Sequence, residues 1–320
     1  SSQRSRSALD TASPSQSQGS RRTEIPAPTA TMAVKSADPV HKLLEDYVKA
    51  HGGDQVIRKI LIANNGMAAT KAIMSMRQWA FLELGSHRCL EFVVMASQDD
   101  LQANAEFIRM ADAYVEVPSG KNTNNYANVK LICEIAKAQG VDAVWPGWGH
   151  ASEVPALPLT LKEMGITFLG PTAPVMHALG DKIASTILAQ SSGVPCIPWN
   201  GDGITAEIQA DGSIPQEPFK KACLQNFEEA LVHAKRIGYP VVLKASEGGG
   251  GKGIRKANTD AELKLGWEQV VAEVVGSPIF MMQLCVNARH LEVQLVGDHH
   301  GDVIALCGRD CSTQRRFQKI

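Results

Sequence analysis

Short apolar runs alternate with longer amphipathic stretches between residues 59 and 170, and this alternation constrains the fold more than any other feature. The runs are too short for core helices and have the continuous hydrophobicity of strands buried on both faces. Strands that alternate with helices predict a doubly wound α/β domain, with its ligand site at the carboxyl ends of the strands. The expected strands are KILIAN, EFVVMAS, AYVEV, VDAVWPG and ITFLGP, and the expected helices span residues 67–84, 100–112 and 126–140.

The second half of the chain has a different pattern, which predicts an α+β arrangement with antiparallel strands. PVVLKAS and GIRKA are typical of two strands joined by a glycine run, and IFMMQLC of a third strand. HLEVQLVG and VIALCGRDC indicate a hairpin with DHHGD as its turn. We expect one helix over residues 176–193, a loop or insertion over residues 201–222, and helices over FEEALVHAKRIG and ELKLGWEQVVAEV.

Residues 1–40 are rich in Ser, Arg, Thr, Pro and Gln and have few large apolar side chains. Such a segment cannot bury enough surface to offset its ordering entropy, so we expect a disordered N-terminal extension. Its scarcity of acidic residues is also typical of a transit peptide, which leaves a plastid location as an alternative to the cytoplasm. A short helix follows from about residue 40 and ends at Gly52-Gly53.

The composition excludes several classes of protein. A formal net charge of -1 argues against nucleic-acid binding through a broad basic face. No stretch approaches the ~20 apolar residues that span a bilayer, so no transmembrane segment is expected. The seven cysteines are scattered without a CxxC pair, which predicts reduced thiols and neither a zinc site nor a disulfide framework.

The strongest local motif is KASEGGGGKGIRK, residues 244–256, where a glycine run lies between two strands. Glycines let backbone N–H groups approach an anion closely, and Lys244 and Lys252 add positive charge. The motif is not a Walker P-loop, because Gly253 follows Lys252 where that motif needs Ser or Thr. A glycine-rich flap over a triphosphate fits better than the alternative, a solvent-exposed flexible loop.

Three further segments could carry chemistry. The first βα turn contains Gly66 but no G-x-G-x-x-G, which weighs against a dinucleotide-dependent dehydrogenase. WPGWGHASE, residues 145–153, ends the fourth strand, and His150 there is either part of a functional loop or a hydrogen-bonded structural histidine. In RHLEVQ, alternation places His290, Glu292 and Gln294 on one sheet face, which could also be an ordinary solvated face.

The C-terminal sequence GRDCSTQRRFQKI is dense in cationic and amide side chains: Gln314, Arg315, Arg316, Gln318 and Lys319. Such clusters bind phosphate or carboxylate through charge-assisted hydrogen bonds, although a charge run is more often ordinary surface.

Together these segments resemble the biotin carboxylase domain of eukaryotic-type acetyl-CoA carboxylases over residues 41–320. The resemblance rests on KILIANNGMAATKAI, AVWPGWGHASE, FLGPTAPVMHALGDKIAS, KASEGGGGKGIRK and RHLEVQ…GRDCSTQRR. It implies a Rossmann-like, pre-ATP-grasp α/β domain over residues 41–174, followed by an incomplete α+β ATP-grasp domain. That second domain would comprise a lid subdomain with the glycine flap over residues 175–284 and the start of a C-terminal sheet over residues 285–320.

The resemblance also implies a reaction. ATP and bicarbonate give carboxyphosphate, which carboxylates biotin on a separate carrier domain, as the first half-reaction of malonyl-CoA formation in fatty acid synthesis. The ATP-binding positions that it implies are Lys182, Lys244, Gly248, Gly249, Gly250, Gly251, Lys252, Gly253, Gln283, Cys285, His290 and Gln314. Lys319, near the γ-phosphate, and Glu292 are the implied catalytic positions.

The implied cofactors and partners are ATP, Mg²⁺ (or Mn²⁺), bicarbonate, and the biotin carrier and carboxyltransferase domains of the same polypeptide, with a homo-oligomer in the full-length protein. Phe317 stands where the family usually has a histidine. A phenyl ring cannot donate a hydrogen bond, so the phosphate contact that the resemblance implies at this position is left open. No metal site is expected, because the family's acidic metal ligands and glutamate base would lie beyond Ile320. We therefore expect the 320 residues to be incomplete for catalysis. Another ATP-grasp ligase, such as a carbamoyl-phosphate-forming domain, and a non-catalytic regulatory or interaction module remain the alternatives.

Overall fold

The computed structural model describes residues 39–246, 252–298, 300–315 and 318–319. Three expectations concern residues outside these ranges: the disorder of residues 1–38, the phosphate contact in question at Phe317, and the ATP contacts of Gly248–Gly251. Residues 39–40, also expected to belong to the disordered extension, instead begin a helix that spans Pro39–Ala50.

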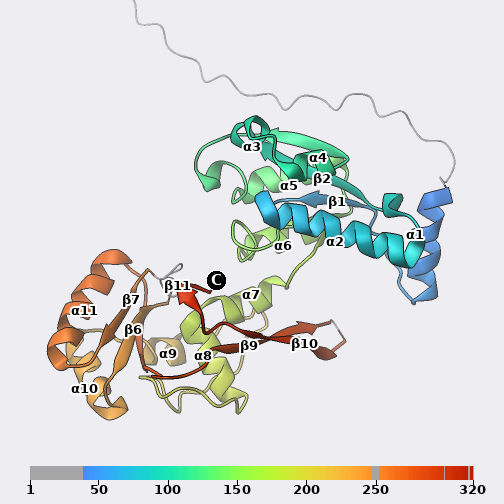
Figure 1. Cartoon of the computed structure of the whole chain (residues 1–320). Coiled ribbons are helices and arrows are strands. Elements are labelled where there is room, and N and C mark those ends of the chain that lie inside the picture. The colour runs from blue at the N-terminus through green and yellow to red at the C-terminus, as the bar shows by residue number, and fades with distance from the viewer. Residues whose placement is uncertain (1–38, 247–251, 299, 316–317, 320) are drawn as a thin grey trace, which may run out of the picture. The chain divides into compact units, whose positions relative to one another are not determined.

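The first half of the described chain contains a five-stranded parallel sheet in the order β3-β2-β1-β4-β5 (Figure 1). The order reverses between β1 and β4, as in doubly wound folds, so the predicted fold class is confirmed. The strands are β1 (Lys59–Ile62), β2 (Glu91–Ser97), β3 (Ala113–Val117), β4 (Ala143–Trp145) and β5 (Thr167–Phe168).

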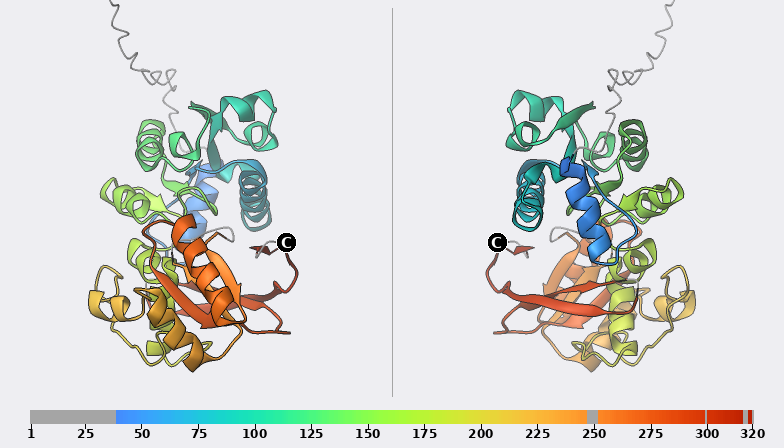
Figure 2. Two further views of the ribbon diagram at one scale, coloured as in Figure 1. Left: turned by 90° about the vertical axis from the view of Figure 1, so that its left-hand side faces the viewer. Right: turned by 90° about the vertical axis from the view of Figure 1, so that its right-hand side faces the viewer.

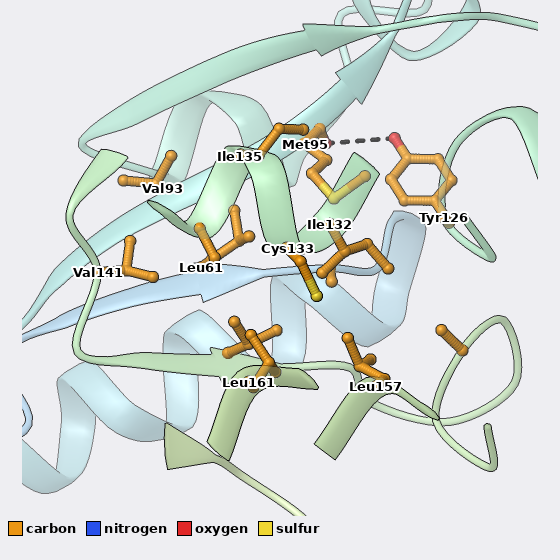
Figure 3. Close-up of a cluster of buried hydrophobic side chains, with 14 of the residues drawn as sticks. Leu61, Val93, Met95, Tyr126, Ile132, Cys133, Ile135, Val141, Leu157 and Leu161 are labelled. Atoms are coloured by element: carbon orange, nitrogen blue, oxygen red, sulfur yellow. Dashed lines mark hydrogen bonds between the residues drawn. The ribbon is translucent and has the colours of Figure 1, made fainter. Parts of the chain in front are cut away.

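Helices cover both faces of this sheet because successive strand residues point to opposite faces. Leu61 and Val93 pack with α5 and α6 in the cluster of Figure 3. Their neighbours Ile60 and Phe92 pack instead with α1, α2 and α4. Helical elements of this half are α1 (Pro39–Ala50), α2 (Gly66–Leu84), α3 (Gln98–Gln102), α4 (Glu106–Met110), α5 (Val129–Gln139), α6 (Ala156–Glu163) and the 3-10 turns η1 (His87–Cys89) and η2 (Asn122–Asn124).

One helix of this half differs from its prediction. The single helix expected over residues 100–112 is two short helices, α3 and α4, separated at Asn104, whose φ is +50°. Ser97 and Asp100 form a capping box that fixes the start of α3 directly after β2. The periodicity of the segment concealed this break, because asparagine tolerates the left-handed conformation in an otherwise helical pattern.

The second half contains a three-stranded antiparallel sheet in the order β7-β6-β8, as the α+β pattern predicted. Figure 2 shows helix α11, in orange, against these strands. Leu243 and Met281 face α10 and α11, whereas Phe280 faces α8. The elements are α7 (Ala173–Gly180), α8 (Lys182–Ser191), α9 (Gln216–Lys221), α10 (Phe227–Ile237), β6 (Val241–Ala245), β7 (Ile254–Ala257), α11 (Asp260–Glu273) and β8 (Ile279–Gln283).

Two predictions for this half need correction. Residues 176–193 are not one helix, because Asp181 adopts an extended conformation (φ −89°, ψ 132°) between α7 and α8. The expected loop over residues 201–222 contains the short helix α9.

The C-terminal segment forms the expected hairpin of β9 (Leu291–Gly297) and β10 (Val303–Asp310), followed by β11 (Gln314–Arg315) and β12 (Gln318–Lys319). Across the described residues, no helix is long and apolar enough to cross a membrane.

Candidate nucleotide site

Lys244 occupies the middle of the three-stranded sheet and points to the α8 side. Its register partner across the antiparallel pair is Phe280, so the two side chains share a sheet face. The Lys244 Nζ lies 3.7 Å from the Met282 sulfur and 6.0 Å from the centre of the Phe280 ring. Burial lowers the pKa of Lys244, and the positive charge of Lys182 lowers it further. Lys182 comes from a different motif, and it bonds to Ser246, two residues beyond Lys244.

Lys182 is the first residue of α8, directly after the break at Asp181. Its Nζ donates a hydrogen bond to the carbonyl oxygen of Ser246 at 2.6 Å. Asp181 caps α8, since its Oδ1 accepts from the N–H groups of Ile183 and Ala184 at 2.8 and 2.9 Å. Its Oδ2 accepts the hydroxyl of Ser246, which is 1% exposed. The start of α8 is therefore bonded to the end of β6.

Gly253, on the C-terminal side of the glycine run, is also fixed by tertiary contacts, and this side is called the anchored flank. Gly253 has a φ of +68°, and a Cβ built there would lie 2.7 Å from the Ala245 Cβ, so the position requires glycine. The Gly253 N–H donates to Glu273 Oε2 at 2.9 Å and holds the pKa of Glu273 below its usual range. Arg255 pairs with the same carboxylate at 3.1 Å. The exposed Lys252 lies directly before this anchor.

The expected adenine hinge ends β8. The Gln283 N–H donates to the Pro198 carbonyl at 2.8 Å, and the Leu284 N–H donates to the Pro240 carbonyl at 2.9 Å. These bonds occupy two backbone donors of the segment, so a donor to an adenine ring would have to come from the exposed residue Cys285.

Two predicted positions from separate motifs meet in the structure. The side-chain amide of Gln314 lies 2.7 Å from His290 Nδ1. The His290 N–H donates to Ser312 Oγ at 2.9 Å, and its carbonyl accepts from the Cys311 N–H at 2.6 Å. Position 290 precedes β9 and position 314 follows β10, so the hairpin brings the two residues together.

The two implied catalytic residues lie in the same C-terminal region. Glu292 on β9 accepts from Arg309 Nε at 2.5 Å, and the two residues are register partners across the hairpin. Lys319 lies on β12 opposite Gln314, and its side chain is outside the described part of the structure.

The loop after β4 has a structural explanation. Asn64, 2% exposed, donates through Nδ2 to the carbonyls of Pro146 and Trp148 at 2.7 and 3.0 Å. His150 adopts a φ of +48° and its Nδ1 lies 2.7 Å from Asn122 Oδ1. Burial lowers the pKa of His150. These contacts fit the structural reading of His150.

Sequence reasoning missed three residues that hold the site: Asp181, Ser246 and Glu273. Only Asp181 left a usable signal, because an aspartate before an apolar periodic stretch is a typical helix N-cap. Within the described ranges, no three His, Cys, Asp or Glu side chains are grouped to hold a metal ion. Mg²⁺ that arrives with a nucleotide needs only one or two carboxylates beside the phosphate oxygens, so these residues need not form a metal cage of their own.

Comparisons with known proteins identify the family of the chain. The family described as "Biotin carboxylase, N-terminal domain" matches residues 56–176, and "Carbamoyl-phosphate synthase L chain, ATP binding domain" matches residues 206–320. The acetyl-CoA carboxylase of Dictyostelium discoideum is 56% identical over 87% of this chain, and that of Saccharomyces cerevisiae is 52% identical over 94%. The chain spans 12% and 14% of the lengths of these relatives.

Two solved structures share the fold. The biotin carboxylase domain dimer of the Hydrogenobacter thermophilus 2-oxoglutarate carboxylase, in complex with MgADP, ADP and bicarbonate, is 31% identical with a TM-score of 0.70 over 83% of this chain and 52% of that one. A Campylobacter jejuni biotin carboxylase, described as a β-γ-ATP complex, is 31% identical with a TM-score of 0.69 over 82% of this chain and 53% of that one.

The fold and the converging lysines define a Rossmann-like α/β domain followed by the strands and helices of an ATP-grasp domain. The chain belongs to the biotin carboxylase family, and within it the chain is similar to eukaryotic acetyl-CoA carboxylases.

Proposed function

We propose that this chain binds ATP and contributes to the ATP-dependent carboxylation of biotin with bicarbonate, the first half-reaction of an acetyl-CoA carboxylase. The observation that carries the proposal is that Lys182 bonds to Ser246, two residues beyond Lys244, at the end of the strand that pairs with Gly253 on the anchored flank of the glycine run. The full reaction leads to malonyl-CoA and fatty acid synthesis.

The chemical reasoning starts from the cost of placing an ammonium group against Phe280 and Met282. Burying a charge is unfavourable unless an opposite charge compensates for it. A polyphosphate supplies that charge, and phosphoryl transfer depends mostly on positioning and on neutralising negative charge. ATP, when bound, would supply the phosphoryl group that activates bicarbonate, and the lysines would bind and orient its phosphates.

The remaining parts of the proposal rest on the family. Gln283, Cys285, His290 and Gln314 would contact the nucleotide, with Glu292 and Lys319 near the reacting groups. Mg²⁺, the biotin carrier and the carboxyltransferase domains would take part as in the relatives. We also propose the domain division 41–174, 175–284 and 285–320, and a homo-oligomer, since the Hydrogenobacter domain is described as a dimer.

The seven cysteines are all free thiols in the described chain, which supports a cytoplasmic location.

Calorimetric titration of the chain with ATP tests the binding. Lys244→Ala should weaken ATP binding by about 1.5–3 kcal/mol, the range for a hydrogen bond to a charged group. Lys256→Ala on neighbouring β7 is the control, because Lys256 is exposed and should leave the affinity unchanged. Absence of ATP binding, or equal affinity in Lys244→Ala, would contradict the proposal and favour a non-catalytic module.

A second measurement tests the reaction class, because the matching ATP-binding family is described by the carbamoyl-phosphate synthase name. In the full-length protein, phosphate release from ATP should require both bicarbonate and biotin. Release that requires ammonia and not biotin would favour a carbamoyl-phosphate-forming ligase. The identity of over half the residues with acetyl-CoA carboxylases favours the first outcome.

A further inference from the structure

Two hydrogen bonds join the elements that carry the two lysines. Ser246 directly follows β6, two residues beyond Lys244, and Asp181 directly precedes Lys182. The Ser246 hydroxyl donates to Asp181 Oδ2, and the Lys182 ammonium donates to the Ser246 carbonyl at 2.6 Å. The bonded residues are 65 and 64 positions apart in the sequence, so this is a tertiary link between α8 and β6.

We propose that Asp181 and Ser246 are positioning residues, which fix the spacing of the Lys182 and Lys244 ammonium groups to fit the phosphates of a nucleotide. The inference rests on the proposed function and deepens it, because it assigns a role to two residues outside the proposed ATP-binding positions.

The cap alone does not explain the arrangement. Capping α8 uses only Oδ1 of Asp181, which leaves Oδ2 directed at Ser246. In the same half of the chain, Asn226 caps α10 through its Oδ1 alone. A helix cap therefore does not require the second side-chain bond that Asp181 makes. Ser246 is 1% exposed, so its hydroxyl depends on this partner. Both groups are thereby held in one orientation.

Removing the Asp181 charge should change ATP affinity in opposite directions under two hypotheses: that Asp181 positions the lysines, or that it merely lies near them. A carboxylate near two lysines reduces their positive potential and repels a polyphosphate. If Asp181 does not position the lysines, Asp181→Ser, which removes its charge, should tighten ATP binding. If Asp181 positions the lysines, the same substitution should weaken binding, because misplacing a charged group removes its hydrogen bonds to the phosphates. Serine caps helices as well as aspartate does, so α8 keeps its start, and its single short hydroxyl cannot bond Ser246 as well.

Calorimetry with ATP on the 320-residue chain tests this with Asp181→Ser, Ser246→Ala and the double variant. We expect each single substitution to weaken binding about 5-fold, the equivalent of one hydrogen bond of about 1 kcal/mol. The double variant should bind no more weakly than the single variants, because both remove the same link. Asn226→Ala, which removes a cap away from the lysines, should lower stability and leave ATP affinity unchanged.

Other outcomes overturn the inference. Equal or tighter binding by Asp181→Ser, with Lys244→Ala still weakened, refutes the positioning role and leaves the proposed function intact. Additive losses in the double variant refute it as well, since the two residues would then act separately. No ATP binding by the wild-type chain, or no effect of Lys244→Ala, refutes the proposed function and this inference together.

Discussion

Replacement of Lys244 by methionine should stabilise the protein while it removes nucleotide binding. The Lys244 side chain lies against the Met282 sulfur and the Phe280 ring, and a methionine of similar length would fill the same space. It removes an ammonium group whose pKa is lowered by burial and by Lys182. The gain is the relief of a desolvated charge plus the burial of a terminal methyl, about 1–2 kcal/mol in the free energy of unfolding at pH 7.

The pH dependence provides an independent check. A lysine whose pKa is lower in the folded state than in the unfolded chain binds fewer protons when folded, so it makes stability rise with pH. This rise begins at the lowered folded pKa and ends near the ordinary lysine value of about 10.4. The stability of the wild type should therefore approach that of Lys244→Met as the pH rises through this window.

Urea unfolding of both proteins at several pH values, with calorimetry for ATP, makes the measurement. Lys256→Met is the matched control: Lys256 is an exposed lysine on the adjacent strand, and its substitution should change neither quantity appreciably. A Lys244→Met protein that is less stable than the wild type at pH 7, or that binds ATP equally well, would refute the reasoning.

Two further substitutions test the anchors of the fold by urea unfolding. Gly253→Ala should lower the free energy of unfolding by about 1–3 kcal/mol, because φ is +68° and the new Cβ would meet the Ala245 Cβ. Gly276→Ala is the control for backbone strain alone, because Gly276 has a φ of +81° and open space around it. Equal losses of stability in the two variants would contradict the steric part of the argument. Asn64→Ala should lower the free energy of unfolding by about 1–3 kcal/mol, because it leaves the Pro146 and Trp148 carbonyls without their donor. Asn124→Ala, at an exposed position, should change stability little. Similar losses in the two variants would argue against a structural role of Asn64.

The sequence predicted most of the elements, because burial imposes visible periodicity. The strand EFVVMAS is β2, and the helix stop at Gly85 is real, with a left-handed φ of +74°. The predictions failed where one polar residue interrupts an otherwise regular pattern. Asn104 divides one expected helix and Asp181 the other, and such breaks depend on local hydrogen bonds that periodicity does not show.

By itself, the sequence determined the doubly wound class of the first half, the glycine run between two strands and the residue types of the candidate nucleotide site. Strand alternation and glycine content are local properties, so they can be read along the chain. Only the tertiary structure decided that Ser246 bonds to Asp181, that Gly253 is anchored on Glu273, and that His290 meets Gln314. Each of these contacts joins residues at least 20 positions apart, because strand register and helix packing bring distant side chains together.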